Sequence, residues 1–243
     1  MTARVTLAVA ARVLAQLRRD PRTIVLIIAV PCLLETLLRE LFRGGPVFQQ
    51  AGAPLLGLFP FITMFLVTSI TMLRERTSGT LERLMTMPLA KLDLLAGYGI
   101  AFALVAIVQA TIVSLLAFGL LDLHVAGSRL LVVVLAVANA VLGTALGLFV
   151  SAFAQTEFQA VQFMPAIVLP QILLCGLFVS RAQMAGWLRW ISDALPLTYA
   201  YDALAHAAND TLDARFTLDV AVVCGCIVLA LALGAVTLRR RTG

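Results

Sequence analysis

Six long apolar segments constrain the fold of this chain more than any other feature of its sequence. They cover residues 22–38, 53–73, 92–121, 130–153, 158–180 and 217–238, to within a few residues at each end. An α-helix crosses the hydrocarbon of a membrane with about 20 apolar residues, a length that these segments reach or approach. They do not alternate between apolar and polar residues, which favours helices over barrel strands. The sequence therefore predicts an all-α membrane protein with six transmembrane helices, forming one domain over residues 1–243.

The composition excludes several other classes of protein. Hydrophobic residues make up 61% of the chain and charged residues only 13%, whereas about a quarter of the residues of an average soluble domain are charged. The net charge is +5, but the arginines are not gathered into the single basic patch of a nucleic-acid-binding protein. We therefore expect neither a soluble domain, nor a disordered chain, nor a nucleic-acid partner.

The basic residues predict the orientation of the chain in the membrane. If the N-terminus lies inside, the inner segments hold 12 arginines and lysines and the outer segments hold 6. Such an excess is typical of the cytoplasmic side. We therefore expect both termini in the cytoplasm and an outer segment, residues 181–216, between the last two spans.

Residues 4–19 predict an amphipathic helix that lies in the plane of the cytoplasmic membrane surface and contacts lipid. On a helical wheel its arginines fall in one sector, and apolar residues such as Val9 and Val13 fall in the opposite one. The arginines are Arg4, Arg12, Arg18 and Arg19. Asp20-Pro21 ends this helix before the first span. The alternative is that these residues only orient the first span.

The segment 74–91, between the second and third spans, carries most of the functional information. It begins with three charged residues of both signs, continues with a turn-forming Thr-Ser-Gly sequence and then shows helical spacing up to Pro88. A short charged helix held between two spans is suited to docking into a cleft of a partner protein. The alternative is a solvated loop that only follows the charge rule, and spacing alone leaves both open.

Small and polar residues recur every fourth position along one face of the fourth span. They are Asn139, Gly143, Gly147 and Ser151. Small residues at this spacing let two helices approach closely, and an asparagine can hydrogen-bond across the contact. We therefore interpret this face as a helix-packing surface rather than a substrate contact.

The fifth span begins with a polar face and is interrupted by prolines. Its candidate pathway residues are Gln159, Gln162, Pro165 and Pro170. Prolines free backbone carbonyls, which persist in a membrane only where protein or water satisfies them. We therefore expect this span to face the protein interior. In the first span, we interpret Glu35 and Arg39 as an ion pair that reaches toward the interface, not as a proton relay.

The outer segment 181–216 predicts two short helices in the outer leaflet, separated at Pro196. Aromatic residues at membrane interfaces anchor such helices. The predicted anchors are Trp187, Trp190, Tyr199 and Tyr201. A ligand-contacting role for any one of them is the alternative.

The chain lacks the motifs of catalysis. Its one lysine, Lys91, lies outside any GxxxxGK sequence, its two histidines are isolated and no GxSxG sequence occurs. We therefore expect no enzyme activity, no metal and no cofactor in this chain, and a pathway that depends on a separate source of energy.

Two stretches in this order resemble the membrane subunit of type-2 ABC exporters, the ABC-2 permease family, which includes drug-resistance permeases. The first is Arg74 to Pro88, similar to that family's first cytoplasmic loop. The second is Ile191 to Leu204, similar to its outer segment before the last span. The resemblance covers essentially the whole chain.

The resemblance implies that the loop and the N-terminal helix contact a separate ATPase subunit, two copies of which bind ATP and magnesium. The coupling residues would be Arg74, Glu75, Arg76, Thr77, Ser78, Gly79, Thr80, Leu81, Glu82, Arg83 and Leu84. It also implies a second permease subunit, identical or paralogous, in a bacterial cytoplasmic membrane. Aromatic residues are only 7% of the chain, which favours a small amphipathic substrate, a drug or lipid, over a long polysaccharide.

Two other functions stay open at this point. A membrane scaffold could use the same loop to recruit a soluble partner without transport. A secondary carrier would need an ion gradient, for which the spans hold few titratable groups.

Overall fold

The computed structural model of the chain describes residues 3–79 and 91–237. All regular structure in these residues is helical, which confirms the predicted all-α class. The helices are, in chain order, α1 (Ala3–Arg18), α2 (Pro21–Leu41), α3 (Pro46–Thr77), α5 (Lys91–Gly119), α6 (Arg129–Val150), α7 (Glu157–Phe163), α8 (Leu169–Leu174), α9 (Gly186–Asp193), α10 (Pro196–Ala208) and α11 (Ala214–Thr237). A π-helical turn, Met164–Val168, joins α7 to α8, and a short 3-10 helix, Arg181–Gln183, precedes α9.

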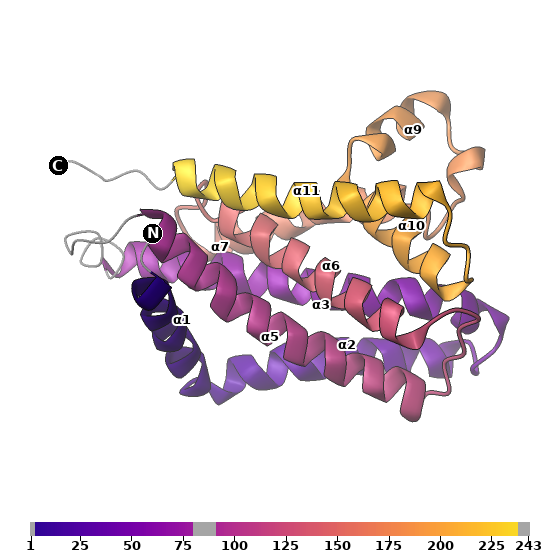
Figure 1. Ribbon diagram of the computed structural model, residues 1–243, viewed down its shortest axis with the longest axis horizontal. Helices are drawn as coiled ribbons and strands as arrows, with labels where there is room; N and C mark the ends of the chain where they lie inside the picture. The colour runs from indigo at the N-terminus through magenta and orange to yellow at the C-terminus, as the bar shows by residue number, and fades with distance from the viewer. Residues whose placement is uncertain (1–2, 80–90, 238–243) are drawn as a thin grey trace.

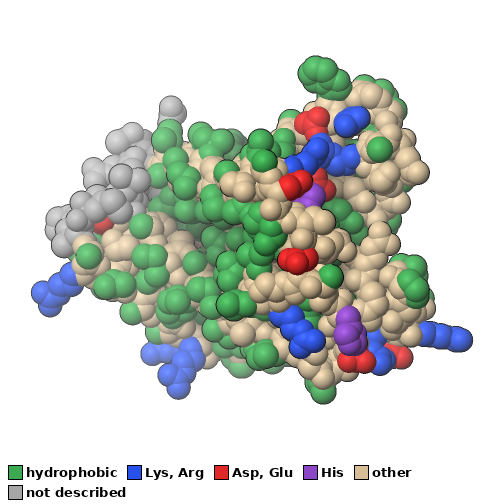
Figure 2. Space-filling view, turned by 45° about the vertical axis from the view of Figure 1, so that its right-hand side comes forward, with side chains coloured by type: hydrophobic (Ala, Val, Ile, Leu, Met, Phe, Trp, Pro, Cys, Tyr) green, Lys and Arg blue, Asp and Glu red, His purple; other side chains and the backbone are tan. Residues whose placement is uncertain are grey.

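The long helices run along the long axis of the molecule, and α1 lies across them at one end (Figure 1). The last turn of α3, the first turn of α5 and the last turn of α11 lie at this same end, whereas α9 projects from the other half of the molecule. Figure 2 shows a broad apolar band across the middle of one face, with charged side chains gathered toward its two ends. This is the distribution expected of a bundle that crosses a membrane.

Five helical segments in the described residues are long and apolar enough to cross a membrane. They are α3, α5, α6, the continuous α7–α8 segment and α11. The first apolar run forms α2, which has 21 residues, four of them charged, and is not among these five.

Local sequence explains where the first helices begin. Asp20 accepts hydrogen bonds from the Thr23 hydroxyl and backbone N–H, at 2.6 and 3.2 Å, and Pro21 occupies the first turn of α2. These bonds, the one from the hydroxyl above all, lower the pKa of Asp20. Gly44, with φ +65°, turns the chain before Pro46 begins α3. The second span therefore starts at Pro46 rather than near residue 53.

Helix α3 forms the centre of the bundle, and α6 packs closely along it. A Cβ atom on Gly143 would lie 2.3 Å from the carbonyl oxygen of Phe61, and one on Gly147 would lie 2.5 Å from that of Phe65. Asn139 and Ser151, on the same face of α6, are buried. The small-residue face of the fourth span therefore lies directly on the backbone of α3.

The interpretation of Glu35 and Arg39 as an ion pair is wrong. Glu35 is fully buried, and neither of its carboxyl oxygens has a hydrogen-bond partner. Arg39 instead donates to the carbonyl of Leu121 at 3.1 Å and to the carboxylate of Glu40 at 2.5 Å. The spacing of four residues brought the two side chains to the same side of one helix, but the loop after α5 offers Arg39 a backbone acceptor.

Candidate functional site

The predicted coupling segment begins at the end of the bundle that α1 crosses (Figure 1). Arg74, Glu75, Arg76 and Thr77 form the last turn of α3, and Ser78 and Gly79 follow it. Gly79 has φ +72°, a backbone conformation that favours glycine after a helix. The predicted coupling residues Thr80, Leu81, Glu82, Arg83 and Leu84 lie outside the described residues.

Arg74 and Arg76 each attach the end of α3 to a different part of the bundle. Nε and Nη2 of Arg74 donate to the two carboxylate oxygens of Glu157, at the start of α7, at 2.7 and 3.0 Å. Nη1 of Arg76 donates to the carbonyl of Ser151, at the end of α6, at 2.9 Å. Both arginines therefore fix the position of the last turn of α3.

Glu75 points in a third direction, toward α1. Its side chain is only 3% exposed and lies 3.4 Å from Nη2 of Arg12. The same nitrogen of Arg12 donates to the hydroxyl of Tyr98 at 2.5 Å, and the guanidinium lies 5.8 Å from the centre of the Tyr98 ring. The Arg12 guanidinium offsets the cost of burying the charge of Glu75, because an unpaired buried charge is strongly destabilising.

Two further contacts hold α1 against the beginning of α5. The Thr6 hydroxyl donates to the carboxylate of Asp93 at 3.3 Å. A Cβ on Gly97 would lie 2.6 Å from the side chain of Val9, so the two helices touch closely there. We name Thr6, Arg12, Glu75, Asp93 and Tyr98 the α1–α3–α5 junction. Through it, α1 contacts both helices that flank residues 80–90.

The arginines of α1 divide into two groups. Arg4 and Arg18 are exposed, as is Arg19 directly after the helix. Arg12 instead contacts Glu75 and Tyr98, with one third of its side chain exposed. The helical wheel placed all four together, because it shows the face of a helix and not the acceptors that another helix brings to it.

The candidate pathway residues of the fifth span lie on the outside of this chain. Gln159 is half-buried, and its side chain accepts the backbone N–H of Gln155 at 2.9 Å. Gln162, Pro165 and Pro170 are exposed. The expectation that this span faces the interior is therefore not met within a single chain. Of the membrane-spanning segment Glu157–Leu174, only 22% is buried.

The predicted outer anchors lie on α9 and α10. Trp187 and Trp190 are 66% and 81% exposed. Tyr199 donates to the carbonyl of Asp193 at 2.6 Å, so it links the two helices. Tyr201 is half-buried near the left-handed Gly176.

Arg181 ties this outer region together. It bonds to Asp193 at the end of α9 and, at 2.8 Å, to Asp202 on α10. The Ser192 hydroxyl donates to the carbonyl of Leu174 at 2.8 Å and so attaches α9 to the end of α8. No group of three or more potential metal ligands occurs in the described part of the chain.

Two functional candidates escaped sequence reasoning. Tyr98 sits in an apolar run whose spacing gives no hint that Arg12 reaches it. Gln109, in the middle of α5, is fully buried and donates to the Ile27 carbonyl at 2.7 Å. Pro31 lies four residues after Ile27 and has no N–H, so it leaves that carbonyl free. Pro31 was therefore the sequence signal that the Ile27 carbonyl would need a donor from another helix.

Comparison with known proteins agrees with this architecture. The sequence model of the ABC-2 type transporter family matches residues 4–208. A probable multidrug ABC transporter permease of Escherichia coli strain K12 is 29% identical over 148 residues, which cover 61% of this chain and 40% of that protein. ABC transporter G family member 20 of Dictyostelium discoideum is 26% identical over 147 residues, 60% of this chain and 20% of that protein. The chain thus spans less than half of either relative, and it belongs to the ABC-2 type transporter family as a membrane permease.

Proposed function

We propose that this chain is the permease subunit of an ATP-driven exporter that moves a small amphipathic substrate, a drug or a lipid, across a bacterial cytoplasmic membrane. Membership of the ABC-2 family supports transport, and the name of the Escherichia coli relative supports a multidrug substrate. ATP and magnesium would bind to a separate ATPase, because the sequence has one lysine and no phosphate-binding motif around it.

In this proposal α2 is also a span, the first in chain order, which brings the number of spans to six, and both termini lie in the cytoplasm. Its 21 residues suffice to cross the hydrocarbon at 1.5 Å per residue. Its charged residues are placed to allow this, since Arg22 begins the helix and Arg39 and Glu40 end it. Only Glu35 lies deeper, and it is buried in protein rather than in lipid.

The α1–α3–α5 junction is the observation that carries the proposed mechanism. The coupling segment, residues 74–91, would dock into the ATPase, and nucleotide-driven closure of two ATPase subunits would displace this segment. Because Glu75 and Tyr98 both bond to Arg12, α1 would move with the ends of α3 and α5. The displacement would then reach the spans as a rigid-body change between inward-open and outward-open states.

A second permease subunit, identical or paralogous, completes the pathway. Gln162, Pro165 and Pro170 are exposed, and both the amide of Gln162 and the backbone carbonyls that the prolines leave free are costly to expose to hydrocarbon. A second subunit packed against this span would cover these groups and place the candidate pathway between two chains.

Reconstitution with an ATPase tests the proposal. The chain is co-expressed with the ATPase encoded beside it, purified and placed in lipid, and ATP hydrolysis is measured with and without lipophilic drugs. Stable association and a drug-dependent rate are expected. Association without any drug response or export would favour the membrane scaffold, and no association with an ATPase would overturn the proposal.

Variants separate coupling from folding. Glu75→Gln keeps the shape of the side chain but removes the charge of the buried pair, and Glu82→Lys reverses a charge in the predicted docking segment. Both should bind the ATPase less productively and reduce the drug response of hydrolysis while the protein stays folded. Arg189→Gln, an exposed position at the other end of the molecule, is the control and should respond like the wild type.

A further inference from the structure

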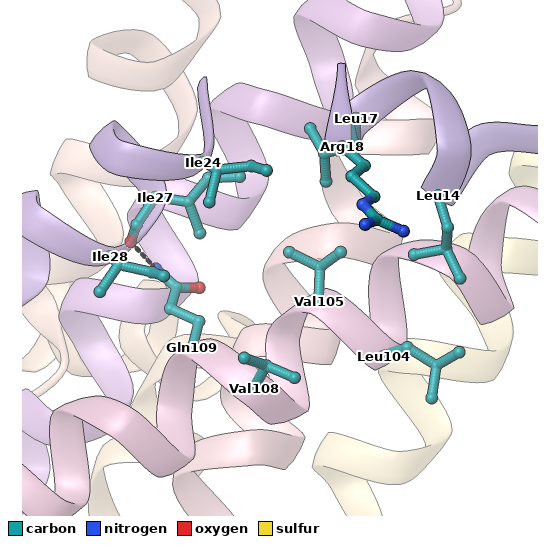
Figure 3. Close-up of a pocket in the computed structure, with 10 residues that line it drawn as sticks. All are labelled: Leu14, Leu17, Arg18, Ile24, Ile27, Ile28, Leu104, Val105, Val108 and Gln109. Atoms are coloured by element: carbon teal, nitrogen blue, oxygen red, sulfur yellow. Dashed lines mark hydrogen bonds between the residues drawn. The ribbon is translucent and has the colours of Figure 1, made fainter. Parts of the chain in front are cut away.

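An apolar pocket lies at the corner where α1 turns into α2, against the middle of α5. Its volume is about 220 Å³. Aliphatic side chains line its walls, among them Leu17 from α1, Ile24 and Ile28 from α2 and Val105 from α5 (Figure 3). A space of this kind is poorly suited to water, which needs several polar partners to occupy a cavity. The pocket is suited to a hydrocarbon chain.

The floor of the pocket contains one polar group, Gln109. Its nitrogen donates to the carbonyl of Ile27 and, at 2.5 Å, to the hydroxyl of Thr63, which fixes the side chain. Its oxygen is buried and has no hydrogen-bond partner, and the side chain borders the pocket (Figure 3). A carbonyl oxygen repels anions, so an anionic group cannot bind at this depth.

The mouth of the pocket is basic. The guanidinium of Arg18 lies over the opening (Figure 3), and Arg19 and Arg22 are exposed on either side of the same turn. The one carboxylate in the turn, Asp20, is already hydrogen-bonded to Thr23. No hydrogen bond or ion pair is recorded for the side chains of these three arginines among the described residues. With three arginines and one carboxylate, the turn carries a net positive charge, and Arg18 places part of it at the pocket.

We propose that this pocket binds an anionic phospholipid of the membrane leaflet that faces α1, with one acyl chain between α1, α2 and α5 and the phosphate at Arg18. The basic mouth and the acceptor on the floor set the direction of the lipid. The volume admits part of one chain, so the second chain lies along the surface. The inference rests on the proposed function only in placing α1 at the membrane surface.

The occupied site would act on the α1–α3–α5 junction. Leu17 and Arg18 line the pocket on the same helix that carries Arg12, the residue bonded to Glu75 and Tyr98. A lipid in the pocket fills the corner behind α1 and holds it against α5. Anionic lipid should therefore stabilise the folded permease beyond what a neutral lipid with the same chains achieves.

Lipid binding is measured on the purified permease alone, without ATPase or nucleotide, so that its result is independent of the proposed transport. Phosphatidylglycerol and phosphatidylcholine with identical chains are titrated in detergent, and native mass spectrometry and thermal unfolding record binding and stabilisation. Phosphatidylglycerol should bind preferentially. One interfacial arginine contributes about 1 kcal/mol to the binding of an anionic lipid. Arg18→Gln should therefore weaken phosphatidylglycerol binding roughly fivefold.

Two more variants make the test specific. Arg4→Gln removes an exposed arginine from the other end of α1 and should leave phosphatidylglycerol binding nearly unchanged. Val105→Phe fills the pocket and should reduce the binding while the lipid-free protein still unfolds cooperatively. Equal effects of Arg18→Gln and Arg4→Gln, equal binding of the two lipids, or full binding by Val105→Phe would each overturn the proposal.

Discussion

The contact between α3 and α6 allows one prediction to be worked out in detail, the effect of Gly143→Ala. The new Cβ would lie 2.3 Å from the Phe61 carbonyl oxygen and 3.0 Å from both its carbonyl carbon and its Cα. Ordinary contact begins at 3.4 Å. Because every clashing atom belongs to the backbone, no change of rotamer relieves the overlap, and the helices must separate.

The required separation is roughly 1 Å, enough to forfeit up to about half of the dispersion energy of the contacts it opens. Overpacking of this kind costs about 1–3 kcal/mol. For a chain of this length, 1 kcal/mol corresponds to about 2–4 °C in melting temperature. We therefore expect Gly143→Ala to lower the melting temperature of the purified permease by roughly 2–12 °C.

Gly225→Ala is the matched control for this measurement. Gly225 also lies inside a long apolar helix, α11, but a Cβ there would meet nothing within 4 Å. Alanine is the better helix former of the two residues, so Gly225→Ala should melt at the wild-type temperature or slightly above it. Equal melting temperatures for the two variants would refute the reasoning, because they would show that α3 and α6 do not meet at Gly143.

Three further substitutions test other parts of the structure by thermal unfolding. Glu35→Leu should raise the melting temperature, because an unsatisfied buried polar group costs about 1–3 kcal/mol; a decrease would show that the carboxyl has a partner. Asp20→Ala should lower it at neutral pH. Because hydrogen bonds from Thr23 lower the pKa of Asp20, this contribution is present above the unfolded pKa, near 3.8, and is lost as the pH falls through the lower folded pKa. The variant and the wild type should therefore converge in acid, and a constant difference would contradict the assignment. Arg181→Ala leaves the Asp202 carboxylate, whose side chain is 19% exposed, without that ion pair and should cost about 1–3 kcal/mol; unchanged stability would show that the pair contributes nothing.

The sequence was sufficient for features that depend on neighbouring residues. Apolar length located the long helices, and the break at Pro165 appears in the structure as the π-helical turn between α7 and α8. The apolar spacing after Trp187 and the interruption at Pro196 located α9 and α10. Apolar length did not locate the ends of the helices. Helix α3, for example, includes polar residues before its apolar segment and begins only after the turn at Gly44.

Contacts between distant residues could not be predicted in the same way. Helical spacing offers each charged residue a partner one turn away, which is why Glu35 was assigned to Arg39. The fold instead brings Arg12 to Glu75, 63 positions along the chain, and Gln109 to Ile27, 82 positions away. The partner of a polar group inside a membrane protein is decided by which helices are adjacent, and one sequence does not specify that.

These distant contacts suggest a reason for buried charged and polar residues in an otherwise apolar bundle. A hydrophobic contact between α1 and its neighbours would permit sliding, since apolar packing has little directional preference. The bonds from Arg12 to Glu75 and Tyr98 fix one position of α1 relative to α3 and α5. In the proposed mechanism, a helix held in this way would transmit displacement from either flank of residues 80–90 to the other. Arg18, two turns further along α1, would give the membrane access to the same element. On this argument, weakening the junction and emptying the lipid pocket should have the same consequence, a looser α1, and the effects of Glu75→Gln and Arg18→Gln on the drug response of ATP hydrolysis should be less than additive.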